Sequence, residues 1–147
     1  MAHYGTTVDG DAYFTEKLYI QPWDEATEDQ RNRALSEATR LINQLRFSGS
    51  KTVETQAFEF PRDDDTVVPE KIEWATYEIA LALLDGVDPN LEHENLAVSS
   101  DGYSSVRSTY NRTTAPEHFV AGIPSRQAWL YLRPFLADVR GLRLRRV

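Results

Sequence analysis

The side chains that could carry acid, base or metal chemistry are scattered along this sequence. Its three histidines, His3, His93 and His118, lie outside any nucleophile motif, and the chain has no cysteine. A nucleophilic triad needs a base beside its nucleophile, and no spacing here indicates one. The absence of cysteine also excludes thiolate metal sites and cysteine nucleophiles. We therefore expect a protein that is not an enzyme and has no catalytic residues.

One acidic stretch resembles the start of a calcium-binding loop. Asp88, Asn90 and Glu92 have the alternating spacing of such a loop. Its sixth position, which requires glycine for a sharp turn, is His93, and Ser99 stands at the twelfth in place of glutamate. The stretch is more typical of an acidic loop that ends a helix. We predict neither a metal nor a cofactor.

A pattern that suits nucleic-acid binding lies in the second half of the chain. Arg107 and Arg112 are interleaved there with Tyr103 and Tyr110, and single-strand binders combine basic and aromatic side chains in this way. The same spacing also fits a strand with one packed and one solvated face, the interpretation we favour from the sequence. Acidic side chains elsewhere would repel a phosphate backbone.

Charge is distributed unevenly along the chain, which carries −7 in total. Residues 1–101 hold 8 basic and 21 acidic side chains, a net −13, whereas residues 102–147 hold 8 basic and 2 acidic ones, a net +6. Four arginines crowd the last eight positions: Arg140, Arg143, Arg145 and Arg146. Such asymmetry indicates a basic tail that binds a partner.

Length and composition indicate one globular domain. The chain has 147 residues, 41% of them hydrophobic and 27% charged, which is enough to bury a core. The polar N-terminus does not fit a signal peptide, and no apolar run approaches the roughly 20 residues of a membrane span. We expect synthesis in a host cytoplasm, no membrane partner, a single domain over residues 1–139 and a basic tail over residues 140–147.

Helices are expected to position these side chains. A capping box at Thr27 predicts a helix that continues to Leu45, and Pro69 opens a second that continues to Leu84. A third begins at Pro124, with a kink or break at Pro134. Shorter elements are a helix over residues 11–18, an extended segment over 56–61 and an extended β-arm or hairpin over about 99–122. The predicted fold class is mainly α: a small helical bundle, with the two long helices antiparallel, plus the arm and the tail.

Several short patterns occur in an order found in a known family. They are Ala34-Leu35-x-x-Ala38-Thr39-Arg40-Leu41-Ile42, Phe47-x-Gly49-x-Lys51, Gln56-x-Phe58-x-Phe60-Pro61-Arg62, Ala75-x-x-Glu78-x-Ala80 and Leu130-x-Leu132-x-Pro134-Phe135-Leu136. Over residues 10–137 the sequence resembles the head–tail connector, or adaptor, proteins of tailed bacteriophages. Some close relatives of that family are labelled DnaT-like single-stranded-DNA-binding proteins.

The resemblance implies a structural protein of the virion neck. Connector proteins are mainly α-helical and form dodecameric rings beneath the portal. Such a ring extends the DNA channel, docks the tail or nozzle protein and lets double-stranded DNA pass during ejection. For this chain the resemblance therefore implies a homo-oligomer located in the virion, with the portal protein as its partner. The alternative function is that of a single-stranded-DNA-binding protein, and a third option is a lysin-like or other enzyme.

Site residues follow from the connector hypothesis. The portal interface would use the four C-terminal arginines, whose guanidinium groups pair with carboxylates in oriented contacts. Channel-facing candidates are acidic, because like charge keeps DNA sliding: Asp63, Asp64, Asp65, Glu92 and Glu94. The arm would contact the tail or a neighbouring copy through Tyr103, Arg107, Tyr110 and Arg112. A steep dependence of DNA binding on salt would instead support the single-strand binder.

Overall fold

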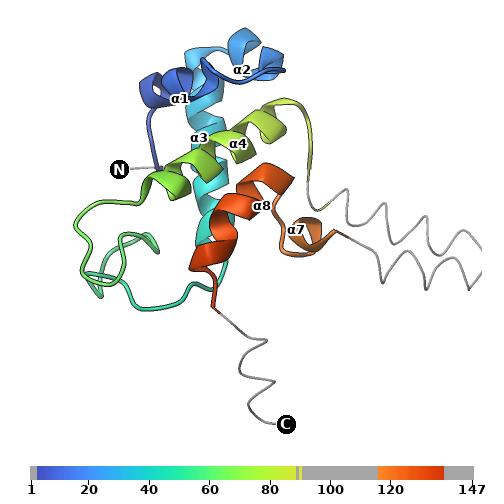
Figure 1. Cartoon of the computed structure of the whole chain (residues 1–147). Coiled ribbons are helices and arrows are strands. Elements are labelled where there is room, and N and C mark those ends of the chain that lie inside the picture. The colour runs from blue at the N-terminus through green and yellow to red at the C-terminus, as the bar shows by residue number, and fades with distance from the viewer. Residues whose placement is uncertain (1–2, 89, 91–115, 138–147) are drawn as a thin grey trace, which may run out of the picture.

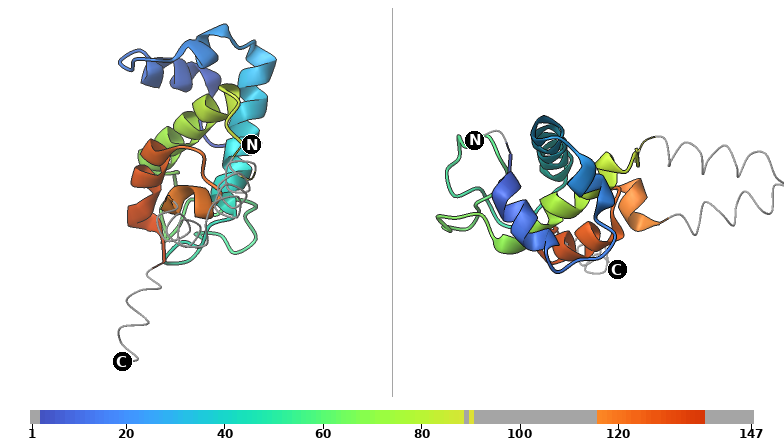
Figure 2. Two further views of the ribbon diagram at one scale, coloured as in Figure 1. Left: turned by 90° about the vertical axis from the view of Figure 1, so that its right-hand side faces the viewer. Right: turned by 90° about the horizontal axis from the view of Figure 1, so that it is seen from above.

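Two long helices form the centre of the fold. The computed structural model describes residues 3–88, 90 and 116–137, and within them α3 (Glu28–Asn43) and α4 (Glu70–Leu84) share the most extensive contact. Another side of α4 is covered by α8 (Arg126–Leu132), which continues into the 3₁₀ turn η1 (Arg133–Phe135). Figures 1 and 2 show α4 crossing α3 obliquely rather than lying alongside it as the expected antiparallel partner.

The long helices begin where the sequence predicts. Thr27 Oγ1 accepts a hydrogen bond from the Gln30 N–H at 3.2 Å, and the Gln30 side chain accepts one from the Thr27 N–H at 2.9 Å. This capping box satisfies two N–H groups that a helix otherwise leaves unpaired. Pro69 directly precedes α4, and Pro134 lies in η1, so the expected break in the last helix is confirmed.

Helix α4 is buried around most of its circumference. Besides α3 and α8, the short helices α1 (Thr7–Phe14) and α2 (Gln21–Glu25) contact it. Its buried residues include polar as well as apolar side chains: Ile72, Ala75, Thr76, Tyr77, Glu78, Ile79 and Ala80. A helix covered on several sides must place even its polar side chains against neighbouring helices, and these then need hydrogen-bond partners.

Helix α1 begins at Thr7 rather than at Asp11. Thr6 Oγ1 accepts a hydrogen bond from the Asp9 N–H at 3.0 Å and starts the helix. Gly10 therefore lies inside α1, where an added Cβ would come within 2.9 Å of the buried Trp23 ring. Asp9-Gly10 has the composition of a turn that precedes a helix. Here the glycine instead allows the helix backbone to lie close to the Trp23 ring.

The loop between α3 and α4 is held by side chains that bond to its own backbone. The buried Arg62 guanidinium donates to the carbonyls of Ser48, Gly49 and Glu59 at 2.9, 2.7 and 3.2 Å. Gln56 likewise donates to the Pro61 carbonyl at 2.9 Å. The expected extended segment over 56–61 is not a strand, since β-pairing in the described residues consists of two isolated bridges. The Gln-to-Arg pattern of this loop thus has a structural role.

The rings of the same loop close one end of the core. Phe58 and Phe60 both lie edge-on to Tyr4, with ring centroids 5.1 and 6.5 Å away. Phe60 also contacts Phe47 and, beyond α8, Phe135. The loop therefore joins the N-terminal residues, the end of α3 and the end of α8 in one apolar cluster.

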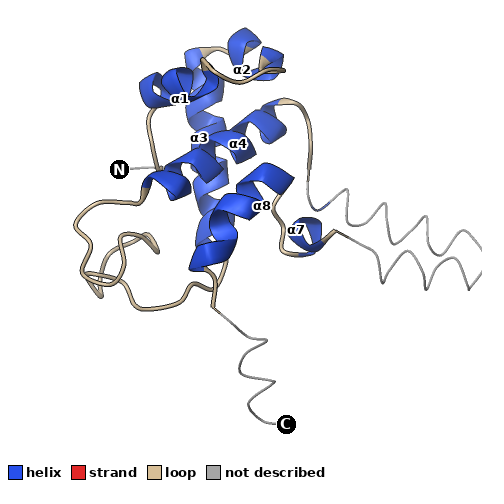
Figure 3. Ribbon diagram, viewed as in Figure 1, coloured by secondary structure: helices blue, strands red, loops and turns tan. Residues whose placement is uncertain are grey.

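The mainly α class is confirmed, whereas the β-arm has no support. Residues 117–120 of the expected arm are helical and form α7 (Glu117–Val120), and residues 91–115 lie outside the described part of the chain. Figure 3 shows helices joined by loops and no strand among the described residues. The predicted basic tail also lies outside them. None of the described helices is long and apolar enough to cross a bilayer.

Substitution of Gly10 tests the contact between α1 and Trp23. Helix propensity alone would make Gly10→Ala stabilising by about 1 kcal/mol. Because the added methyl group would meet the Trp23 ring, we expect instead a loss of about 1–3 kcal/mol in the free energy of unfolding, measured by urea denaturation. Val8→Ala, at a position of α1 that is 73% exposed, is the control and should stay within about 0.5 kcal/mol of the wild type. A Gly10→Ala variant as stable as the wild type would contradict this packing.

Candidate functional site

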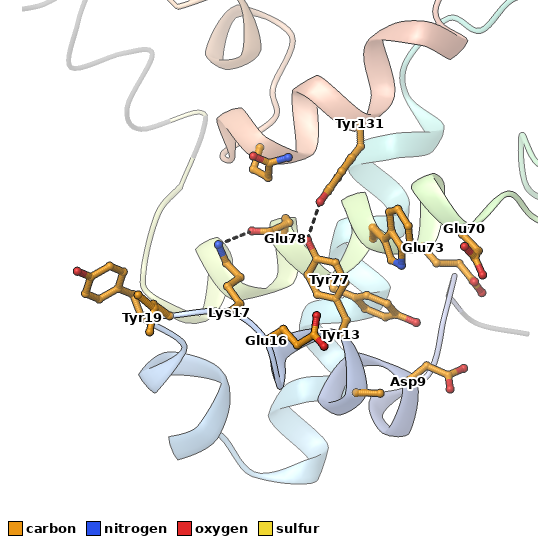
Figure 4. Close-up of a pocket in the computed structure, with 14 residues that line it drawn as sticks. Asp9, Tyr13, Glu16, Lys17, Tyr19, Glu70, Glu73, Tyr77, Glu78 and Tyr131 are labelled. Atoms are coloured by element: carbon orange, nitrogen blue, oxygen red, sulfur yellow. Dashed lines mark hydrogen bonds and ion pairs between the residues drawn. The ribbon is translucent and has the colours of Figure 1, made fainter.

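A surface groove of about 1000 Å³ lies between α1, α4 and α8 (Figure 4). We call it the acidic aromatic groove, because aromatic and carboxylate side chains dominate its lining. The lining residues are Asp9, Ala12, Tyr13, Glu16, Lys17, Leu18, Tyr19, Glu70, Glu73, Trp74, Tyr77, Glu78, Gln127 and Tyr131.

The floor of the groove is a polar network around one buried carboxylate. Glu78, whose side chain is 5% exposed, accepts a hydrogen bond from the Tyr13 hydroxyl at 2.6 Å and pairs with Lys17 Nζ at 3.6 Å. Tyr131 lies 3.0 Å from Tyr13, hydroxyl to hydroxyl, and must donate because the Tyr13 proton is directed at Glu78. Burial, followed by the bond to Glu78, raises the pKa of Tyr13. The network fixes α1 and α8 on α4.

The rim of the groove carries negative charge that no basic side chain of the described residues balances. Within the described residues, none of Asp9, Glu16, Glu70 and Glu73 forms an ion pair. Partial burial, and then the charges of Asp9 and Glu70, raises the pKa of Glu73. Such a surface repels phosphate and attracts cationic groups. The groove is therefore no candidate for contact with a nucleic-acid backbone.

A smaller hollow beside α3 has the opposite character. It measures about 530 Å³ and is lined by His3, Asn32, Arg33, Ser36, Glu37 and Arg40. Arg33 pairs with Asp29 at 3.2 Å, whereas Arg40 forms no ion pair with any described residue. This hollow offers a strand of nucleic acid at most an auxiliary contact, because it holds few basic groups.

The structure describes only some of the predicted site residues. Asp63, Asp64 and Asp65 are exposed in the loop before α4, away from the groove lining, and Asp63 Oδ1 accepts a hydrogen bond from the Ser50 N–H at 3.0 Å. The remaining candidates lie outside the described residues: Glu92, Glu94, Tyr103, Arg107, Tyr110, Arg112, Arg140, Arg143, Arg145 and Arg146.

Sequence reasoning missed the acidic aromatic groove. Its side chains come from three helices that lie far apart in the chain and from the turn after α1, so no linear spacing indicates the site. Trp74 and Tyr77 lie within the helix predicted from Pro69 to Leu84, and Glu78 belongs to the pattern Ala75-x-x-Glu78-x-Ala80 that carries the family resemblance. A carboxylate among apolar helix positions is the one signal that could have indicated a buried partner.

The described part is a small, mainly helical domain with an acidic surface groove and a loop held by its own side chains. A sequence model of the family described as "Putative DnaT-like ssDNA binding protein" matches residues 3–145. The chain belongs to this family. No curated protein and no solved structure matches it.

The family match corrects the expected function. The predicted role of a head–tail connector that forms a ring below the portal is wrong for this chain, and so are the associated virion, neck and tail-docking roles. The reason is that the family to which the chain belongs is described as DnaT-like and single-stranded-DNA-binding. The assignments of residues to a portal interface and a DNA channel lose their basis with it. The DnaT-like label, which the sequence suggested for relatives of connectors, is confirmed as the family. Self-association and the absence of enzymatic activity stay predictions.

The hydroxyl of Tyr13 provides a test of the groove network. Tyr13→Phe removes the hydrogen bond to a buried carboxylate, so we expect a loss of about 1.5–3 kcal/mol in the free energy of unfolding. The matched control is Tyr131→Phe, which removes a hydroxyl–hydroxyl bond and should cost only about 0.5–1.5 kcal/mol. Equal losses in urea denaturation would show that Glu78 does not depend on Tyr13.

Alkaline conditions should weaken the fold through two other tyrosines. Burial raises the pKa of both Tyr4 and Tyr77 to about 12, whereas a tyrosine in an unfolded chain ionises near pH 10. Between these values the unfolded state has lost protons that the folded state retains. Their contribution to stability is thus complete below about pH 10 and is lost as the pH rises towards 12. Urea denaturation across this range should show the decline, and Tyr77→Phe should make it shallower; an unchanged slope in the variant would contradict the assignment.

Proposed function

We propose that this protein binds single-stranded DNA. The observation that carries the proposal is the match of the DnaT-like family over residues 3–145, which is nearly the entire chain. The sequence adds a chemical reason, because one segment combines arginines with tyrosines in the manner of single-strand binders.

The distribution of charge favours that segment over the described residues, which we call the body. The described residues hold 10 basic and 19 acidic side chains, a net −9, so the body repels a phosphate backbone. Several of its basic groups are also occupied, since Arg62 holds a loop and Lys17 pairs with Glu78. Residues 103–112 contain two arginines and no carboxylate. DNA contact is therefore assigned to Tyr103, Arg107, Tyr110 and Arg112.

These four residues would bind DNA through two kinds of contact, ionic contacts with phosphates and stacking on bases. The guanidinium groups of Arg107 and Arg112 contact phosphates and release counterions, while the tyrosine rings stack on bases. Stacking requires bases that are free of a complementary strand. The proposed site thus prefers single-stranded to duplex DNA and has little dependence on sequence, because every base offers a π-face.

Fluorescence anisotropy with a labelled thymidine oligonucleotide of about 20 nucleotides tests the proposal. We expect binding whose affinity falls steeply between about 50 and 200 mM salt. The double substitution of Arg107→Gln and Arg112→Gln should weaken binding and reduce the salt slope by roughly 0.7 for each lost phosphate contact. Tyr103→Ala with Tyr110→Ala should weaken binding by about 1–3 kcal/mol per lost stack, with the salt slope retained.

Two comparisons make this experiment decisive. Lys71→Gln removes an exposed positive charge from α4, outside the proposed segment, and should leave affinity nearly unchanged. A duplex of the same length should bind more weakly than the single strand. Absence of DNA binding at low salt would reject the function, and equal effects of Lys71→Gln and the arginine substitutions would reject the assigned segment.

A further inference from the structure

The acidic aromatic groove has the chemistry of a binding site for a cationic peptide. Four carboxylates at its rim, Asp9, Glu16, Glu70 and Glu73, have no ion-pair partner among the described residues. Aromatic rings stand between them, and Trp74 packs on Tyr131 with ring centroids 5.7 Å apart. Arginine binds both kinds of group, since its guanidinium pairs with carboxylates and stacks on aromatic faces.

The groove also has an exposed apolar edge. Leu18 is 74% exposed and Tyr19 is 82% exposed, side by side in the turn after α1. Tyr19 has a positive φ of 62°, a conformation that costs free energy for a residue other than glycine. Figure 4 shows its ring directed away from the floor of the groove. A large ring held outwards in a strained turn is suited to contact with a partner.

The chain itself contains a segment that complements this surface. Residues 140–147 hold four arginines and no carboxylate, and Leu142, Arg143, Leu144 and Arg145 alternate apolar with basic side chains. An extended peptide of this pattern directs Arg143 and Arg145 to one side and Leu142 and Leu144 to the other. Its four positive charges equal in number the four rim carboxylates that form no ion pair with a described residue.

We propose that the acidic aromatic groove binds the arginine-rich segment 140–147 of a second copy of this chain. The arginines pair with the rim carboxylates, and the leucines contact Leu18, Tyr19 and the aromatic walls. This contact links copies of the protein and does not depend on the proposed DNA binding, which is assigned to other residues.

The positions of the described ends favour a second copy over the same chain. Thr7 Oγ1 donates to Glu28 Oε1 at 2.6 Å, which fixes the start of α1 beside the start of α3. Ala137, the last described residue before the tail, donates to the Arg46 carbonyl at 3.0 Å, just beyond the other end of α3. Figure 1 shows α1 and the end of α8 at opposite ends of the molecule. Helix α3 is about 24 Å long, whereas the three residues from Ala137 to Arg140 span at most about 11 Å. Arg140 of a chain's own tail therefore falls short of the α1 wall, whereas the tail of a second copy is not tethered at this end of α3 and can bring any of its arginines there.

Disulfide trapping tests the contact with the full-length protein, because the natural chain has no cysteine. One variant carries Gln127→Cys in the groove and a second carries Val147→Cys at the end of the tail. Mixed under oxidising conditions, the two should form a heterodimer of twice the 16.8 kDa chain mass. The control replaces the groove variant by Val53→Cys, in the loop between α3 and α4, where the side chain is 56% exposed.

We expect the groove pair to form about tenfold faster than the control pair, because several surface ion pairs together are worth roughly one order of magnitude in affinity. The advantage should disappear in about 0.5 M salt. It should also disappear when Glu70→Gln and Glu73→Gln are added to the groove variant, but not when Glu25→Gln and Glu54→Gln are added. Circular dichroism of each variant verifies the fold. Acidic surroundings disfavour the thiolate, so a faster reaction in the groove cannot arise from thiol reactivity.

Two results would overturn the proposal. One is an equal rate of heterodimer formation for the groove and control pairs. The other is a bridge that closes within a single chain carrying both Gln127→Cys and Val147→Cys, with no covalent dimer, which would assign the groove to the chain's own tail. Failure of the DNA titration described above would leave this proposal standing, since it tests different residues.

Discussion

Burial of α4 on several sides is the constraint on which the rest of the structure depends. A helix covered by α3, α8 and the two short N-terminal helices can offer water only a small part of its surface. Its polar side chains must then be satisfied inside the protein, and Glu78 is satisfied by Tyr13 and Lys17. The position of α1 follows from these bonds and from the contact of Gly10 with Trp23. Where α1 and α8 leave α4 partly uncovered, the acidic aromatic groove results (Figure 4).

The residues that the structure describes differ in net charge from the rest of the chain. The described residues carry −9, and among the other residues six arginines face four carboxylates. An acidic body discourages unspecific contact with nucleic acid, and it attracts cationic segments. One proposal assigns DNA binding to residues 103–112, and the other assigns the C-terminal arginines to the groove. The two clusters of arginine therefore bind different partners in these proposals.

The patterns that resembled connector proteins illustrate how a sequence pattern can indicate packing rather than function. The Gln-to-Arg run holds the loop before α4, because Gln56 and Arg62 bond to its carbonyl groups. Ala75 and Ala80 are buried on α4, and Glu78 between them anchors α1. Residues of this kind are required by a fold and are shared by proteins with different partners. The connector function therefore did not follow from them, and the family match over residues 3–145 replaced it.

The sequence by itself determined the elements whose signals are local. The capping box at Thr27, the proline before α4 and the break at Pro134 depend on backbone groups within a few residues, so they could be predicted. Tertiary structure alone decided the close contact of α1 with Trp23, the oblique crossing of the long helices and the groove. Each of these depends on side chains distant in sequence: a glycine against Trp23, and Tyr13 with Tyr131 around Glu78. Contacts between distant residues leave no periodicity in a single sequence, and that is why the candidate site became visible only in the folded chain.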